Sequence, residues 1–160
     1  MMNEVKRMKK VLLFIVMMIF IVGCQQHQTP VSLSQEERKE ETMSILKVEG
    51  ENINIRVQME DNMAAQDLLS RLPMEVQFED YNQTEKIYYL DKELDTSEAP
   101  MSCTPDKGTL ACYVPWGNIC FFYQDFRTSQ GLVPLGKVIE GMEDLDKLDQ
   151  VHHITLSLES

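Results

Sequence analysis

Apolar and polar residues alternate in several short runs of this chain, and this pattern constrains its fold more than any other feature. In residues 53–59 every second side chain is apolar, and the side chains between them are polar. A period of two is typical of a β-strand with one buried face, because successive side chains point to opposite faces. Residues 154–158 repeat the pattern near the end of the chain.

Several further segments also favour strands, and turn-forming residues separate them. Residues 45–48 precede the first run across the turn 49–52, which predicts a hairpin. Residues 119–123 are apolar throughout, so we expect this strand to be covered on both faces. The remaining expected strands are 76–78, 87–90, 109–114 and 133–139.

One segment has the period of a helix. In residues 63–72, the apolar side chains of Ala65, Leu68, Leu69 and Leu72 fall on one helical face. Either Asp61 or Asn62 can cap the start of this helix, and Pro73 ends it. A short helical turn is expected over residues 142–148. Many short strands with one or two small helices predict a mainly-β sandwich or barrel in a single domain.

Several motifs resemble a cyclophilin-like family of bacterial proteins. The resemblance spans residues 45–158 and rests on motifs that occur in the family's order. These are residues 62–65, 72–73, 79–87, 113–118, 122–126 and 131–137. It implies a closed β-barrel of about eight strands with one or two short helices. It implies no established reaction, because a shared fold does not carry a function with it.

Peptidyl-prolyl isomerisation is the enzymatic alternative that the resemblance suggests. True cyclophilins are similar to one another around an arginine in a phenylalanine-rich strand. Here Arg56 lies among polar and aliphatic residues, and no segment matches that motif set. The preferred expectation is therefore a non-catalytic binding or interaction module, with a divergent isomerase as the alternative.

The N-terminus has the features of an export signal. A basic patch at residues 6–10 precedes the apolar run 11–22. Twelve residues span about 18 Å as a helix, less than the roughly 30 Å of a bilayer core, which disfavours a permanent transmembrane helix. Residues 21–24 resemble the bacterial lipobox, which implies a diacylglyceryl group on Cys24.

The resulting domain plan has three parts, and it implies an exported protein held at the cell envelope by its lipid. Residues 1–23 are expected to be a lipoprotein signal peptide, 24–42 a polar tether, and 43–160 the cyclophilin-like domain. Residues 24–160 carry 11 basic and 25 acidic residues, a net charge of −14. Such a charge argues against a nucleic-acid partner and repels anionic headgroups, so attachment should depend on the acyl chains.

Aromatic residues gather in one part of the chain and suggest a ligand pocket. All ten aromatics of residues 24–160 lie between Phe78 and Phe126, and Trp116 falls in a turn. A pocket built here would bind a peptide, protein or small-molecule ligand. Its expected residues are Tyr81, Asn82, Glu85, Tyr113, Trp116, Asn118, Phe122, Tyr123 and Arg127. In the alternative interpretation, the same side chains form barrel core and rim hydrogen bonds.

The cysteines leave several pairings open. If Cys24 carries lipid, three cysteines remain, and they cannot all pair within one chain. A three-residue turn at 115–117 would place Cys112 opposite Cys120, whereas a four-residue turn would pair Tyr113 with Cys120. The sequence is equally compatible with a Cys103–Cys112 bond and with free, buried thiols.

Metal and cofactor chemistry have weak support. His152 and His153 would point to opposite faces of a strand, so they cannot chelate one ion together. The acidic residues of 140–149 lack the spacing of a calcium loop and are expected to form a solvated helix face. Nucleotide and hydrolase motifs are also missing. We therefore expect neither a metal nor a cofactor.

Overall fold

The computed structural model describes residues 43–159. The expected signal peptide, the expected lipidation site Cys24 and the expected tether lie outside the described residues. Among residues 43–159, no helix is both long enough and apolar enough to cross a membrane.

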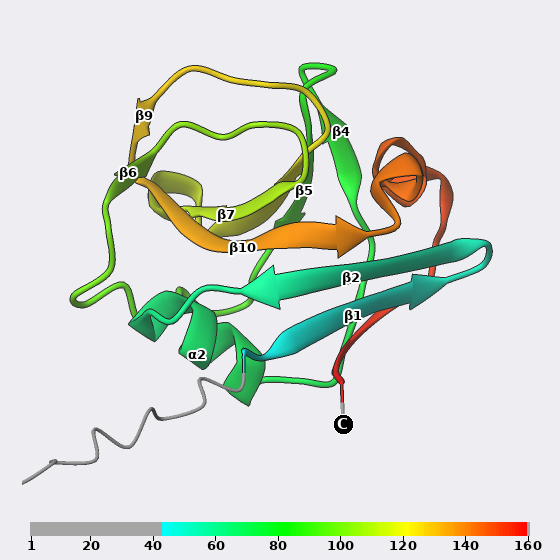
Figure 1. Cartoon of the computed structure of the whole chain (residues 1–160), viewed down its shortest axis with the longest axis horizontal. Helices are drawn as coiled ribbons and strands as arrows, with labels where there is room; N and C mark the ends of the chain where they lie inside the picture. Colours follow the sequence, from blue (N-terminus) through cyan, green and yellow to red (C-terminus); the bar gives the residue numbers. More distant parts are fainter. Residues whose placement is uncertain (1–42, 160) are drawn as a thin grey trace, which may run out of the picture. The chain divides into compact units, whose positions relative to one another are not determined.

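The chain begins with the hairpin that the alternation predicts. β1 (Ile45–Gly50) pairs antiparallel with β2 (Ile53–Met59) around a tight turn (Figure 1). Asn52 adopts a positive φ of 58° in that turn, a conformation that asparagine tolerates better than most residues. Every second residue of β2 is buried, from Ile53 to Met59. The expected hairpin is therefore confirmed.

The expected helix is present and slightly shorter than predicted. α2 (Met63–Ser70) has Asn62 as its N-cap, whose side-chain oxygen accepts a 3.0 Å hydrogen bond from the Ala65 amide. This contact satisfies one of the amides that a helix start leaves unpaired. Ala65 and Leu68 are buried against the sheet, as the helical spacing indicates.

Nine strands form one curled sheet, in the order β3-β11-β1-β2-β10-β7-β8-β5-β4. All neighbouring strands are antiparallel. The remaining strands are β3 (Met74–Val76), β4 (Glu79–Tyr81), β5 (Glu85–Tyr89), β7 (Thr109–Tyr113), β8 (Asn118–Phe122), β10 (Leu132–Glu140) and β11 (Ile154–Leu158). The mainly-β prediction is confirmed.

The barrel is not fully closed, which corrects the expectation of a closed cylinder. The two edge strands, β3 and β4, are consecutive in the chain and separated only by Gln77 and Phe78. β3 pairs with β11 and β4 pairs with β5, but the two edges do not pair with each other. One extended segment therefore reaches both edges, with each half bonded on one side only.

The curled sheet has a large core on its inner face and a smaller apolar cluster on the face of β7 and β8 that points the other way. Leu110, Ile119 and Phe121 belong to the large core. Ala111 and Cys120 belong to the small cluster. Every residue of β8 is buried, so the expectation that this strand is covered on both faces is confirmed.

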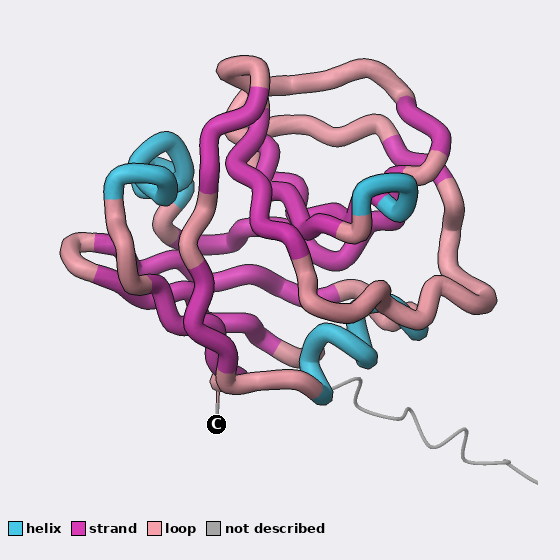
Figure 2. Tube along the Cα trace, turned by 180° about the vertical axis from the view of Figure 1, so that it is seen from behind, coloured by secondary structure: helices cyan, strands magenta, loops and turns pink. Residues whose placement is uncertain are grey.

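A second, two-stranded sheet stands over the small cluster. It pairs β6 (Ser102–Cys103) with β9 (Ser129–Gln130) beside the start of β10, and loops lead to these strands from β5 and from β8 (Figure 1; Figure 2 shows the loops from behind). This small sheet and its loops enclose a pocket against one face of the main sheet.

The acidic segment forms the 3-10 helix η3 (Met142–Gln150), beside the β2–β10 end of the sheet (Figure 1). The expectation of a purely solvated acidic face is wrong for some of its residues. Asp149 accepts a 2.8 Å hydrogen bond from Lys86, whose side chain is only 5% exposed. Asp144 accepts from the Asn54 amide.

The register of β7 and β8 decides among the cysteine pairings. Tyr113 lies opposite Asn118, so Cys112 lies opposite Ile119 and Cys120 lies opposite Ala111. Neither register considered from the sequence is correct, because residues 114–117 form the turn. Cys103, Cys112 and Cys120 are all free thiols. Cys112 packs in the large core and Cys120 in the small cluster, on opposite faces of the sheet.

Candidate ligand-binding site

A pocket of about 460 Å³ opens on the sheet face that β6 and β9 overhang. Its walls come from β4, β5, β7, β8 and the loop that leads through β9 into β10. The lining residues are Tyr81, Glu85, Tyr113, Trp116, Asn118, Phe122, Phe126, Arg127, Thr128, Ser129, Gln130 and Leu132.

Strand alternation explains why these side chains share one face. Asn118 and Phe122 lie an even number of residues apart on β8, so they point to the same side. Cross-strand pairing places Tyr113 opposite Asn118 and Glu85 opposite Phe122. Tyr81 in turn lies opposite Glu85. The small apolar cluster forms the floor beneath them.

Three aromatic rings form one wall of the pocket. The Trp116 ring centroid lies 5.2 Å from that of Tyr81 and 5.3 Å from that of Tyr113. The interplanar angles are 86° and 80°, so both tyrosines meet the indole edge to face. A stacked pair, Phe122 and Phe126, stands elsewhere in the lining with centroids 6.0 Å apart.

The Trp116 turn is built by backbone geometry. Residues Val114–Trp116 form the 3-10 helix η2, and Gly117 ends it in the left-handed conformation, with φ of 64°. The Gly117 amide donates to the Tyr113 carbonyl at 3.1 Å. The turn therefore holds the indole beside the mouth of the pocket, where it remains 44% exposed.

The overhanging loop is tied to the same turn through Gly131. The Val114 amide donates to the Gly131 carbonyl at 2.9 Å, and the Gly131 amide donates to Met101 at 2.8 Å. Gly131 has φ of 80°, and a Cβ there would lie 3.0 Å from Pro115 Cδ. Only glycine combines this conformation with so close an approach.

The inner polar group of the pocket is the Asn118 amide. Asn118 is 1% exposed, and its side-chain oxygen has no hydrogen-bond partner among the described residues. A buried acceptor without a partner costs about 1–3 kcal/mol. Such a group at a pocket wall indicates a place where a bound molecule supplies the missing donor.

Glu85 is the acidic group of the pocket. Its side chain is half-buried and makes no ion pair within the part of the chain that the structure describes. Burial raises the pKa of Glu85, and contact with the Cys120 thiol offsets part of that rise. A desolvated carboxylate without a counter-ion is typical of functional sites rather than of surface ion pairs.

Arg127 is the basic group at the exposed rim. Its guanidinium carbon lies 5.4 Å from the Phe126 ring centroid, within reach of a cation–π contact. No carboxylate of residues 43–159 forms an ion pair with it. The pocket therefore contains one acid and one base that do not pair with each other.

The thiol beneath the pocket is not an activated nucleophile. Cys120 is completely buried and donates to the Ala111 carbonyl at 3.4 Å. Burial raises the pKa of Cys120 well above its ordinary value, whereas reactive cysteines have lowered values. Burial likewise raises the pKa of Cys103.

The structure places seven of the nine sequence-derived candidates in the pocket: Tyr81, Glu85, Tyr113, Trp116, Asn118, Phe122 and Arg127. Asn82 and Tyr123 are not among the residues that line this pocket. Asn82 is exposed in the β4–β5 turn, where φ is 54°.

Tyr123 points to the other face because it directly follows Phe122 in the chain. Its hydroxyl donates to Asp80 at 2.6 Å, and Lys86 Nζ lies 4.7 Å from its ring centroid. Burial and the Asp80 hydrogen bond raise the pKa of Tyr123 to about 12. Tyr123 therefore belongs to an ionic cluster outside the pocket.

Five lining residues were missed from the sequence. Phe126 carried a signal, because it is the last member of the aromatic segment. Leu132 starts a strand whose pairing with β7 is visible only in three dimensions. Thr128, Ser129 and Gln130 have no distinctive pattern, and they reach the pocket because Gly131 turns their loop back.

Comparison with known proteins identifies the class of this chain. The model of the Cyclophilin-like family matches residues 47–159, and the chain belongs to that family. No curated protein sequence matches it.

A solved structure is similar in fold. The solution structure of a hypothetical protein from Archaeoglobus fulgidus is 15% identical, with a TM-score of 0.52. The match covers 72% of this chain and 94% of that one. At this identity the likeness concerns the fold alone.

Proposed function

We propose that this protein is a non-catalytic binding module, anchored at the cell envelope by lipid, that captures a ligand in the Trp116 pocket. One observation carries the proposal. A pocket of about 460 Å³ combines aromatic walls with a buried acceptor, Asn118 Oδ1, that has no partner among residues 43–159. Ligand sites are usually concave and largely apolar, with a few convergent polar groups.

One substitution distinguishes a binding role of the aromatic wall from a purely structural one. Trp116→Ala should abolish the binding of ligands found in a ligand-observed NMR screen of water-soluble fragments. It should leave the circular-dichroism spectrum of the barrel unchanged, because the indole is 44% exposed. Met63→Ala is the control: it removes an apolar side chain that is 38% exposed on α2, outside the pocket.

Two results would contradict this proposal. If Trp116→Ala unfolds the domain, the indole is a structural element rather than a binding one. If Trp116→Ala and Met63→Ala reduce binding equally, the fragments do not bind at the pocket.

The envelope location rests on the N-terminal sequence. Mass spectrometry of the native protein should find a diacylglyceryl group on Cys24, with cleavage after Gly23. Two or more acyl chains hold a protein at a membrane far better than one, since each buried CH₂ contributes about 0.8 kcal/mol. An intact, unmodified Met1 terminus would contradict the anchor while leaving the pocket proposal in place.

A divergent peptidyl-prolyl isomerase is the second candidate. The specific observation in its favour is Arg127, which lies beside Phe126 at the rim of an aromatic pocket in a cyclophilin-like fold. We expect a standard cis–trans peptide assay to give no acceleration above background. Robust turnover that Arg127→Gln removes would reverse the ranking of the two functions.

A further inference from the structure

The chemistry of the pocket narrows the class of ligand. Its two inner polar groups offer acceptors: the Glu85 carboxylate and the Asn118 side-chain oxygen. Within the described part of the chain Asn118 Oδ1 has no hydrogen bond, and the Glu85 carboxylate, which the Cys120 thiol contacts, forms no ion pair. A ligand that contacts these acceptors must therefore bring N–H or O–H donors, at two places four residues apart along the paired strands β5 and β8.

The rings next to these acceptors favour a positive charge. Tyr81 is the cross-strand partner of Glu85, and Tyr113 is that of Asn118. Trp116 bridges the two tyrosines at centroid distances of 5.2 and 5.3 Å. Electron-rich ring faces attract cations, and a carboxylate among rings is the usual complement of an organic ammonium ion.

Arg127 is the one feature that opposes a cation. It is exposed, however, and comes from the loop after β8, whereas Glu85 lies half-buried on β5. Its guanidinium lies over Phe126, which is not among the rings that meet Trp116. The net charge of −14 on residues 24–160 also raises the local concentration of cations.

We propose that the pocket binds a primary organic ammonium group, held by Glu85 beside the Tyr81–Trp116 part of the aromatic wall. This inference rests on the proposed binding function and adds the class of ligand. The ammonium donates its N–H groups to the Glu85 carboxylate, and its alkyl chain packs against the rings. Asn118 Oδ1 accepts from a second donor further along a longer ligand, because Asn118 lies four residues along β8 from Phe122, the cross-strand partner of Glu85. A quaternary ammonium lacks the N–H groups and should bind more weakly.

Trp116 is the only tryptophan in the chain, so its fluorescence reports this site directly. The probes are n-butylammonium, tetramethylammonium, n-butanol and n-butyrate, titrated at pH 7 and constant ionic strength. We expect saturable emission changes with n-butylammonium at concentrations where n-butanol and n-butyrate produce none. Tetramethylammonium should bind at least about tenfold more weakly, because it cannot donate a hydrogen bond.

Three charge variants test the assignment of residues. Glu85→Gln should weaken n-butylammonium binding at least about tenfold, because it removes the counter-ion. Glu79→Gln removes the same charge from an exposed position on β4 outside the pocket, and it should leave the affinity unchanged. Arg127→Gln should increase the affinity for n-butylammonium, because it removes a like charge from the rim of the pocket.

The outcomes separate this inference from the function on which it rests. Preferential binding of n-butyrate or n-butanol would overturn the ammonium assignment and leave a binding pocket. Equal effects of Glu85→Gln and Glu79→Gln, or equal affinity for tetramethylammonium, would overturn it as well. If no probe binds and the fragment screen also finds no ligand that depends on Trp116, the proposed function itself fails.

Discussion

Single residues of the pocket lower the stability of the domain, as the proposed binding function would require. Asn118 shows this most clearly, because its buried side-chain oxygen has no partner among residues 43–159. In a domain that binds no ligand at this place, a leucine at position 118 would extend the small apolar cluster. An asparagine here therefore contributes little to folding, and the proposed binding function gives it a role.

Asn118→Leu should leave the free energy of unfolding unchanged or raise it by about 1–2 kcal/mol, because it removes an unsatisfied buried acceptor. Urea unfolding measures this directly. The matched control is Thr109→Val, which removes a buried hydroxyl that donates to Asp106 at 2.7 Å. That variant should lose about 1 kcal/mol. A loss with Asn118→Leu as large as with Thr109→Val would contradict the unsatisfied state of Asn118.

Protonation of Asp80 should lower the stability of the domain at acid pH. Hydrogen bonds from Lys86 and Tyr123 hold the pKa of Asp80 below its ordinary value of 3.8. A lowered folded-state pKa contributes stability that is present above about pH 4 and is lost as the pH falls through the folded value. Asp80→Asn should therefore be less stable than wild type at pH 7, and the difference should shrink as the pH approaches 3. Parallel pH profiles in thermal unfolding would contradict this.

Elements in this fold are joined by a few specific contacts, and the ion cluster around Lys86 is one of them. Lys86 on β5 reaches Asp80 on β4 at 2.9 Å and Asp149 on η3 at 2.8 Å. It thereby links an edge strand of the incompletely closed sheet to the acidic helix. The contact lies on the face opposite the pocket.

Lys86→Met should destabilise the domain by about 2–3 kcal/mol, because it leaves two carboxylates facing each other without their partner. The figure is below that for a fully buried pair, since both aspartates remain about 30% exposed. Chemical unfolding provides the measurement. Lys147→Met, which breaks an exposed pair with Asp144, should have little effect. Equal effects would show that the buried cluster does not connect these elements.

The loop that carries β9 depends on Gly131 for its position. Gly131→Ala should weaken n-butylammonium binding and lower stability by about 1–2 kcal/mol, because alanine is disfavoured at φ of 80°. The added Cβ would also meet Pro115, in the turn that presents Trp116. Gly117→Ala is the control. Gly117 also has a positive φ, but a Cβ there would lie 3.8 Å from the nearest atom, an ordinary van der Waals distance. A larger effect of Gly117→Ala on stability would contradict the assigned clash.

At the scale of the whole molecule, sequence periodicity predicted the elements that local contacts define. The hairpin of β1 and β2, the Asn62-capped helix and the buried strand β8 follow from spacing and turn residues alone. Strands β4, β6 and β9 were missed because they are two or three residues long and mostly polar. Their existence depends on partners far away in the chain.

The same limit explains why the residues expected from the sequence differ from those that line the pocket. Phe122 and Tyr123 are neighbours at the end of a strand, so only one of them can face the pocket, and alternation would have shown this. Thr128 and Ser129 could not be found, because the pairing of β9 with β6 places their loop. Closure of the barrel was overestimated because the switch of partners within residues 74–81 leaves no local signal.

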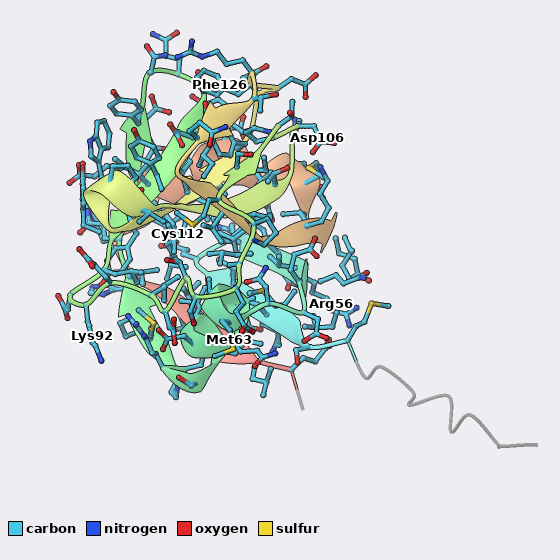
Figure 3. The ribbon with its side chains drawn as sticks, turned by 90° about the vertical axis from the view of Figure 1, so that its left-hand side faces the viewer. Arg56, Met63, Lys92, Asp106, Cys112 and Phe126 are labelled. Atoms are coloured by element: carbon cyan, nitrogen blue, oxygen red, sulfur yellow. The ribbon has the colours of Figure 1, made fainter. Side chains whose placement is uncertain are left out.

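The central claim is that ligands bind on the outer sheet face beside Trp116. Phe126, which lines the pocket, and Met63 of α2 lie at opposite ends of the domain (Figure 3). The direct test is mapping of ¹H–¹⁵N chemical shifts upon titration with n-butylammonium and with the fragment mixture. The account predicts the largest changes at Tyr81, Glu85 and residues 113–118 and 126–132. Changes confined to α2 and its surroundings, or no saturable changes with any probe, would contradict it.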